Sequence, residues 1–102
     1  MSKIALITGA TSGIGAATSH LLAANGFDLI LTGRRNKRLV ELEHELASKY
    51  KAKCLLLCFD VTKPEQVQSS LESLTENWKA VDVLINNAGR SGYLPVLESD
   101  QW

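Results

Sequence analysis

The chain has 102 residues, 45% of them hydrophobic, and its 11 Lys and Arg residues balance 11 Asp and Glu residues. This length allows one small domain at most, and the hydrophobic content excludes a chain that is disordered throughout. The zero net charge argues against a nucleic-acid-binding protein, and no apolar run approaches the roughly 20 residues of a transmembrane helix. Because Met1-Ser2-Lys3 leads directly into a predicted strand without a signal peptide, we expect a cytoplasmic protein that does not bind membranes.

Short, continuous apolar runs recur along the chain and alternate with helical patterns. Such runs are typical of parallel strands that are covered on both faces. The four predicted strands are Ile4–Ile7, Leu29–Leu31, Leu55–Phe59 and Val81–Ile85. The alternation predicts strand, helix, strand, helix, strand, helix and strand, joined by right-handed crossovers.

Each predicted helix has a sequence signature. The first ends at Asn25-Gly26, which is a typical stop signal, and the second has Leu39, Leu42 and Leu46 on one stripe. The third begins with a predicted capping box and a first-turn proline, Thr62-Lys63-Pro64-Glu65. The pattern continues this third helix through Val67, Leu71, Leu74 and Trp78.

A glycine-rich octet, Thr8-Gly9-Ala10-Thr11-Ser12-Gly13-Ile14-Gly15, separates the first strand from the first helix. Free N–H groups at a helix start, together with a helix dipole of about half a positive charge, attract anions. Glycines lack the Cβ atoms that would keep a pyrophosphate at a distance. The spacing is neither the G-x-G-x-x-G dinucleotide fingerprint nor a P-loop, which requires Gly-Lys where this chain has Ile14-Gly15. The octet predicts a pyrophosphate site; the alternative is a tight turn that binds no ligand.

Two further motifs follow predicted strands. Asn86-Asn87-Ala88-Gly89 comes after the fourth strand, at the sheet edge where α/β proteins bind ligands, although the same four residues are also compatible with a simple turn. Asp60-Val61 ends the third strand, where the carboxylate can accept a hydrogen bond from an adenine amino group and the next backbone N–H can donate to the adenine ring. The alternative for Asp60 is a solvated residue that precedes a helix.

Together, the three motifs resemble the short-chain dehydrogenase/reductase family over essentially all 102 residues. The family pattern is T-G-x-x-x-G-x-G after strand one, Asp at the end of strand three and N-N-A-G after strand four. The resemblance implies a Rossmann-type, doubly wound α/β sheet that binds a nicotinamide dinucleotide. Residues 1–102 are then the N-terminal cofactor-binding part of a single domain, whose C-terminal half is missing. Within the family, the chain is similar to bacterial NADP-dependent 3-hydroxy acid dehydrogenases of the serine or allo-threonine type, through Thr32-Gly33-Arg34-Arg35, Ser73-Leu74-x-x-x-Trp78 and Asp100-Gln101-Trp102.

The basic residues around the start of the second helix predict NADP rather than NAD. An NAD enzyme needs an acidic residue at the end of strand two, but that position is Gly33, and Asp28 lies too far back. The start of the second helix instead carries four positive charges, on Arg34, Arg35, Lys37 and Arg38. Positive charges there interact unfavourably with the helix dipole, which suggests that an external anion, the 2′-phosphate, offsets this energy. The alternative is a solvated basic face that pairs with Glu41 and Glu45.

The predicted cofactor-binding residues come from all three motifs and the basic segment. They are Gly9, Thr11, Ser12, Gly13, Ile14, Gly15, Arg34, Arg35, Arg38, Asp60, Val61, Asn87, Ala88 and Gly89. The resemblance places Gly9, Gly13, Ile14 and Gly15 around the pyrophosphate, and Asn87, Ala88 and Gly89 on the adenine-ribose side, where they also stabilise the central sheet.

No catalytic or metal-binding residue is predicted within the chain. Tyr50 and Tyr93 lack the lysine four residues later that the family's catalytic tyrosine requires, so we expect the catalytic residues beyond Trp102. Cys54 and Cys58 are interpreted as small core residues, and His20 and His44 as surface residues.

The resemblance implies hydride transfer between the nicotinamide and a small alcohol or carbonyl substrate, such as a small 3-hydroxy acid, by an intact protein that forms a dimer or tetramer. The 102 residues alone are expected to be inactive, and to aggregate through the unpaired edge strand Val81–Ile85. Two alternatives stay open: a non-catalytic dinucleotide-binding regulator of the same fold, and a product with only a structural or partner-binding role.

Overall fold

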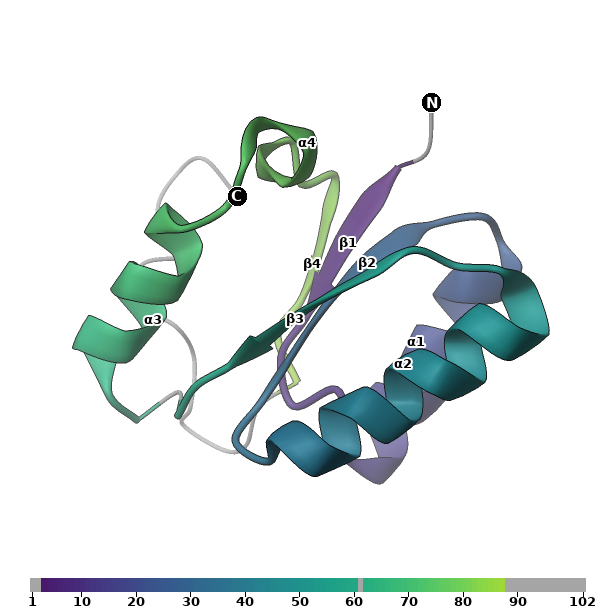
Figure 1. The fold of residues 1–102 in the computed structure, drawn as a ribbon, viewed down its shortest axis with the longest axis horizontal. Helices are drawn as coiled ribbons and strands as arrows, with labels where there is room; N and C mark the ends of the chain where they lie inside the picture. The colour runs from purple at the N-terminus through teal and green to yellow at the C-terminus, as the bar shows by residue number, and fades with distance from the viewer. Residues whose placement is uncertain (1–2, 61, 88–102) are drawn as a thin grey trace.

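The computed structural model describes residues 3–60 and 62–87, in which strands and helices alternate as predicted (Figure 1). The elements, in chain order, are β1 Ile4–Ile7, α1 Gly13–Ala24, β2 Asp28–Gly33, α2 Asn36–Tyr50, β3 Cys54–Cys58, α3 Pro64–Glu72, α4 Glu76–Lys79 and β4 Val83–Ile85. None of the helices in these residues is both long enough and apolar enough to cross a membrane.

The four strands form one parallel sheet in the order β3-β2-β1-β4. β1 lies between β2 and β4, with Ile4 opposite Asp28 on one side and Ala5 opposite Val83 on the other. The chain therefore runs outward from β1 to β3 and returns to the other side of β1, which creates a switch point at the carboxyl end of β1. This order confirms the predicted Rossmann-type arrangement.

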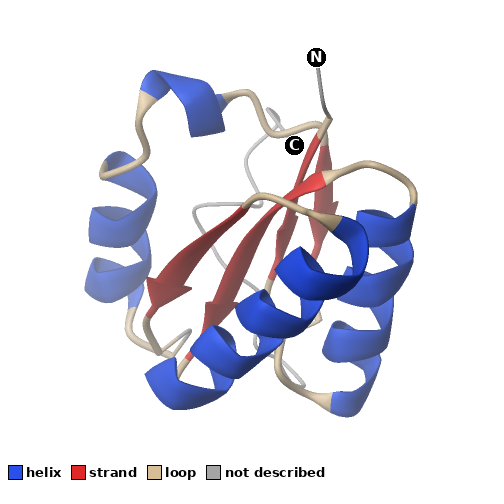
Figure 2. Ribbon diagram, turned by 45° about the vertical axis from the view of Figure 1, so that its right-hand side comes forward, coloured by secondary structure: helices blue, strands red, loops and turns tan. Residues whose placement is uncertain are grey.

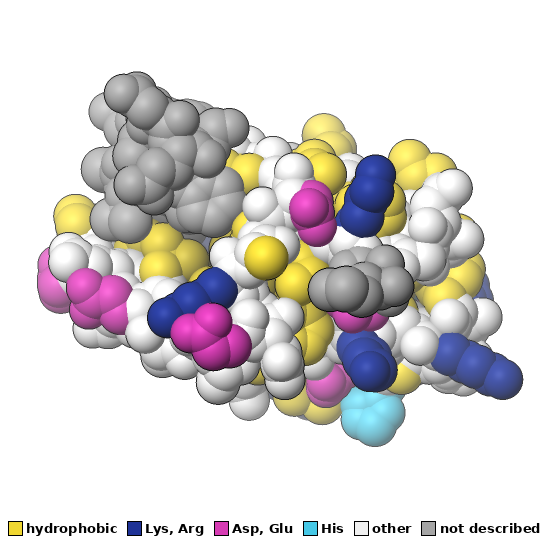
Figure 3. Space-filling model, turned by 90° about the horizontal axis from the view of Figure 1, so that it is seen from above, with side chains coloured by type: hydrophobic (Ala, Val, Ile, Leu, Met, Phe, Trp, Pro, Cys, Tyr) yellow, Lys and Arg dark blue, Asp and Glu magenta, His cyan; other side chains and the backbone are white. Residues whose placement is uncertain are grey.

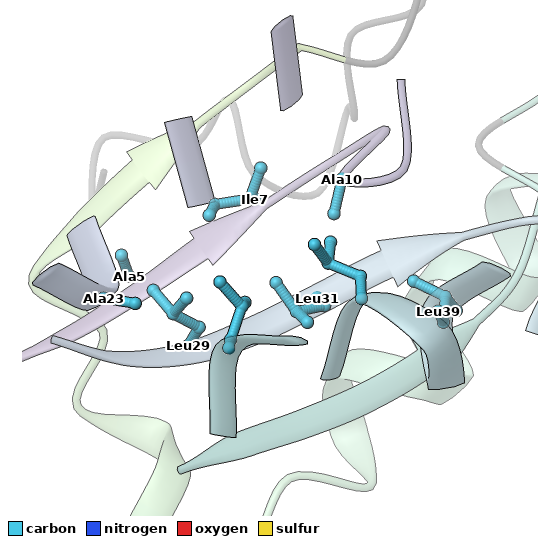
Figure 4. Packing of buried hydrophobic residues seen from close by; sticks show 9 residues of the cluster. Ala5, Ile7, Ala10, Ala23, Leu29, Leu31 and Leu39 are labelled. Atoms are coloured by element: carbon cyan, nitrogen blue, oxygen red, sulfur yellow. The ribbon is translucent and has the colours of Figure 1, made fainter. Parts of the chain in front are cut away.

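The helices cover both faces of the sheet, with α1 and α2 on one face and α3 and α4 on the other (Figure 2). Alternate residues of the central strands point to opposite faces: Ile7 and Leu31 pack against α1 and α2, whereas Leu6 and Ile30 pack against α3. Figure 4 shows the first of these two clusters. Burial on both faces explains why the strands read as continuous apolar runs rather than as alternating patterns.

Local serine and threonine bonds change the predicted third helix in two ways. The helix is not continuous to Trp78: α3 ends at Glu72, and α4 begins after Thr75, which is extended. The Ser73 hydroxyl donates to the Ser70 carbonyl at 2.6 Å, which is the kind of local bond that competes with helix continuation. The predicted capping box is also wrong, since the N-cap is Lys63 and the Thr62 hydroxyl donates to Asp60 instead. The first-turn proline is confirmed.

Candidate functional site

The predicted site residues follow strands whose carboxyl ends lie along one edge of the sheet. The strand arrowheads point the same way in Figure 2, and the glycine turn, the arginines, Asp60 and Asn87 each follow one of them. Val61, Ala88 and Gly89 lie outside the described residues. The described parts of the three motifs and the basic segment thus lie along a common edge of the sheet.

The turn between β1 and α1 is closed by its own hydrogen bonds. Gly9 has a left-handed backbone, with φ of 59°, and its carbonyl accepts bonds from the Ser12 N–H at 3.1 Å and the Ser12 hydroxyl at 2.9 Å. The same hydroxyl accepts the Gly15 N–H at 3.2 Å, so Ser12 is the N-cap of α1. The helix therefore begins directly at the turn, and its dipole is aimed there.

The three glycines of the turn are needed for different reasons. A Cβ on Gly15 would lie 2.1 Å from the Gly9 carbonyl oxygen, so this glycine permits a close approach within the protein. Gly9 is required by its left-handed φ. A Cβ on Gly13 would meet nothing within 4 Å. The first residue of α1 therefore borders open space, which leaves room for a bound pyrophosphate.

Asn87 connects the end of β4 to this turn. Its side-chain amide donates to the Gly9 carbonyl at 3.2 Å and to the Ser12 hydroxyl at 2.9 Å, and its backbone N–H donates to the Thr8 hydroxyl at 2.8 Å. Asn87 therefore holds the glycine turn as well as the strand end. Thr8 and Asn86 also take part, since the Thr8 hydroxyl donates to Asn86 Oδ1 at 3.2 Å. Both residues stand in the predicted motifs but are not among the predicted cofactor-binding residues.

Arg34, Arg35 and Arg38 are exposed around the start of α2. Among the described residues, none of them has an acidic partner within ion-pair distance, and Glu45 pairs with His20 at 3.0 Å instead. The predicted alternative, a solvated basic face that pairs with Glu41 and Glu45, is therefore wrong in its pairing, although the arginines are exposed to solvent. By contrast, basic and acidic side chains are mixed on the face that Figure 3 shows.

Asp60 is held by the loop that joins β3 to α3. Its Oδ1 atom accepts the Thr62 hydroxyl at 2.7 Å and the Thr62 N–H at 2.9 Å. These two bonds, with smaller contributions from the positive charges of Arg34 and Lys63, lower the pKa of Asp60 below its usual value. The carboxylate is therefore ionised at neutral pH and able to accept a hydrogen bond from a ligand.

The prediction that Cys58 is a core residue is wrong. Cys58 is exposed at the carboxyl end of β3, where its thiol donates to the Arg34 carbonyl at 3.4 Å. Cys54 is half-buried, and burial, with the nearby Glu43 and Asp28 charges, raises its pKa to about 11. His20, predicted to lie at the surface, is partly exposed, and its ring nitrogens contact Glu45 and the Tyr50 hydroxyl.

Known proteins share this arrangement. The short chain dehydrogenase family model matches residues 3–102. Sulfoacetaldehyde reductase 2 of Chromohalobacter salexigens is 47% identical over 89 residues, which cover 87% of this chain and 34% of that protein. Serine 3-dehydrogenase of Rhizobium radiobacter is 42% identical over 89 residues, with the same two coverages of 87% and 34%. The crystal structure of L-sorbose reductase from Gluconobacter frateurii, complexed with NADPH and L-sorbose, has a TM-score of 0.81 at 35% identity and is matched over 98% of this chain and 38% of that one.

The chain spans about a third of the length of these relatives. That third contains the glycine turn, the segment after β2, the end of β3 and the end of β4, which are the four parts of the site built above. The family model covers nearly the whole chain, and both the fold and the motif spacing agree with it. The chain therefore belongs to the short-chain dehydrogenase family.

Proposed function

We propose that this chain is the NADP(H)-binding part of an oxidoreductase that transfers a hydride between the nicotinamide and an alcohol or carbonyl substrate. The observation that carries the proposal is a group of exposed arginines that have no acidic side chain within ion-pair distance among residues 3–60 and 62–87. They follow β2, the strand next to β1, whose glycine turn has open space at Gly13. Backbone N–H groups at that turn suit a pyrophosphate, and guanidinium groups suit a 2′-phosphate. When bound, the nicotinamide supplies the hydride chemistry.

The residues that are present fit this cofactor. Gly13 leaves room for a pyrophosphate, and Gly33 provides no carboxylate to repel a 2′-phosphate beside Arg34. The relatives support NADP as well, since the L-sorbose reductase structure contains NADPH. We propose that the 2′-phosphate contacts Arg34 first, with Arg35 or Arg38 in support.

The substrate is proposed to be a small polar alcohol or carbonyl compound, such as a 3-hydroxy acid. The names of three relatives support this class: one is a sulfoacetaldehyde reductase, one a serine 3-dehydrogenase and one an L-sorbose reductase, whereas a fourth is named as a very-long-chain 3-oxoacyl-CoA reductase. The first three names refer to short polar molecules. A cytoplasmic location and a dimer or tetramer of the intact protein stay predictions, which fractionation and light scattering can test.

The experiment compares Arg34→Ala with Lys49→Ala, which removes an equal charge from the last turn of α2, the helix that begins just after Arg34. Removing charge-assisted bonds of about 1.5–3 kcal/mol should weaken NADPH binding about ten- to a hundredfold. NADH binding should hardly change, because NADH has no 2′-phosphate. Fluorescence titration of the intact protein with both cofactors measures the two affinities.

Equal losses for both cofactors in Arg34→Ala would contradict the 2′-phosphate assignment. A change in Lys49→Ala as large as that in Arg34→Ala would show that general charge, rather than a specific contact, is responsible. Oxidation of small hydroxy acids, followed by the absorbance of the NADPH formed, tests the enzymatic activity and separates it from a role as a non-catalytic dinucleotide-binding regulator.

A further inference from the structure

A hydrogen bond between a side chain and the backbone spans the loop between β3 and α3. The side-chain oxygen of Gln66, in the first turn of α3, accepts the backbone N–H of Asp60 at 3.1 Å. The backbone N–H of Gln66 donates to the Lys63 carbonyl at 3.0 Å, which fixes its place in the helix start. The side chain therefore reaches back across the loop to the residue that ends β3.

Asp60 is held at three points by this loop. Its carbonyl accepts the Lys63 N–H at 3.0 Å, its Oδ1 atom accepts both bonds from Thr62, and its N–H is taken by Gln66. Among the described residues, no hydrogen bond reaches its other carboxylate oxygen, Oδ2. One oxygen thus orients the side chain, and the second is available to a ligand.

The position of Asp60 is tied to that of the arginine segment. The Phe59 N–H donates to the Gly33 carbonyl at 2.9 Å, and the Cys58 thiol donates to the Arg34 carbonyl. The ends of β2 and β3 are therefore joined directly before their chains diverge. A shift of the Asp60 backbone would therefore move the carboxylate that we expect to contact the adenine. This carboxylate lies next to the residues proposed for the 2′-phosphate.

We propose that Gln66 is a positioning residue for the adenosine half of the cofactor, acting through the Asp60 backbone. The inference rests on the proposed NADP(H)-binding function. Gln66 is exposed, so water can replace its bond to Asp60 and global stability changes little. The Gln66 bond fixes the backbone N–H of Asp60, from which the carboxylate oriented by Thr62 extends. Ligands that do not use the adenosine site should not respond to the loss of this bond.

Gln66→Met tests this role, because methionine keeps the length of the side chain and removes the acceptor oxygen. Gln68→Met is the matched control: Gln68 is also exposed on α3, and its amide contacts Glu72 instead of the loop. Three ligands are titrated against the intact protein: NADPH, adenosine 2′,5′-bisphosphate, and reduced nicotinamide mononucleotide, which lacks adenosine. Thermal denaturation of each variant checks the fold.

The expected result is a loss of about two- to tenfold in affinity for NADPH and for adenosine 2′,5′-bisphosphate in Gln66→Met, as for one net hydrogen bond. Affinity for the mononucleotide should not change, and Gln68→Met should match the unmodified protein with all three ligands. An equal loss for the mononucleotide, or no loss for the bisphosphate, would overturn the role of Gln66. Failure of the unmodified protein to bind NADPH would instead overturn the proposed function.

Discussion

The glycine turn and the arginine segment lie at neighbouring strand ends but are built in opposite ways. The turn is closed by bonds to Ser12 and Asn87, so its shape exists before any ligand arrives. The arginines are exposed and, within the described residues, have no acidic partner. A preformed backbone shape suits the pyrophosphate that NAD and NADP share, whereas free cations suit the one phosphate that distinguishes them. The difference suggests that affinity and cofactor choice are controlled by separate, adjacent residues.

Gly15→Ala should have the largest effect, because it places a side-chain atom inside the glycine turn, which is already closed by its own hydrogen bonds. The new Cβ would lie 2.1 Å from the Gly9 oxygen and 2.8 Å from the Asn87 amide, so the turn cannot close as it stands. Overpacking of this kind costs about 1–3 kcal/mol of unfolding free energy or more. Binding of NADPH and NADH should be lost together. Gly13→Ala is the control, and thermal denaturation should leave it within about 0.5 kcal/mol of the unmodified protein.

Gly13→Val should separate folding from binding within the same turn. The position has open space, so circular dichroism should show a retained fold. The branched side chain would occupy the space proposed for the pyrophosphate, and titrations should show that both cofactors fail to bind. A folded variant that retains its cofactor affinity would show that this turn is not the pyrophosphate site.

Asn87→Ala should weaken both cofactors by a similar factor, in contrast to the selective effect expected at Arg34. The substitution removes two bonds, to the Gly9 carbonyl and to the Ser12 hydroxyl, so the turn becomes less well fixed. At about 1 kcal/mol per bond, the two bonds together correspond to a fall in affinity of about thirtyfold. Isothermal calorimetry with NADPH and NADH checks the ratio. A loss of affinity confined to NADPH would show that the glycine turn also affects the choice between the two cofactors.

Gly33→Asp should have the smallest effect on the protein itself and should reverse its preference. A Cβ at this position would lie 3.4 Å from the end of the Leu39 side chain, which is an ordinary contact. The carboxylate would repel a 2′-phosphate and accept bonds from free ribose hydroxyls. NADH affinity should rise a few-fold while NADPH affinity falls, and titration of both cofactors measures the change. A fall in both would indicate that the ribose does not lie at the end of β2.

The strands, the switch point and the position of the glycine turn could be predicted from the sequence, since apolar runs and turn residues are local signals. Contacts between distant residues could not. Asn87 holds the turn from 78 residues away, and Glu45 pairs with His20 across two helices rather than with an arginine on its own helix. The break after Glu72 and the missing capping box escaped prediction because serine and threonine hydroxyls had a choice of nearby acceptors.

The central position of β1 has a consequence for the order in which the protein folds. β1 pairs with β2 through a short connection, whereas its contacts with β4 and Asn87 close much longer loops. Contacts of low sequence separation form early, and during synthesis the amino-terminal segments are available first. The β1-α1-β2 unit can thus form before β4 exists. The bonds from Asn87 to the glycine turn can form only after the end of β4 has joined the sheet. Competence to bind a dinucleotide should therefore appear late in folding, after most of the helix and sheet has formed.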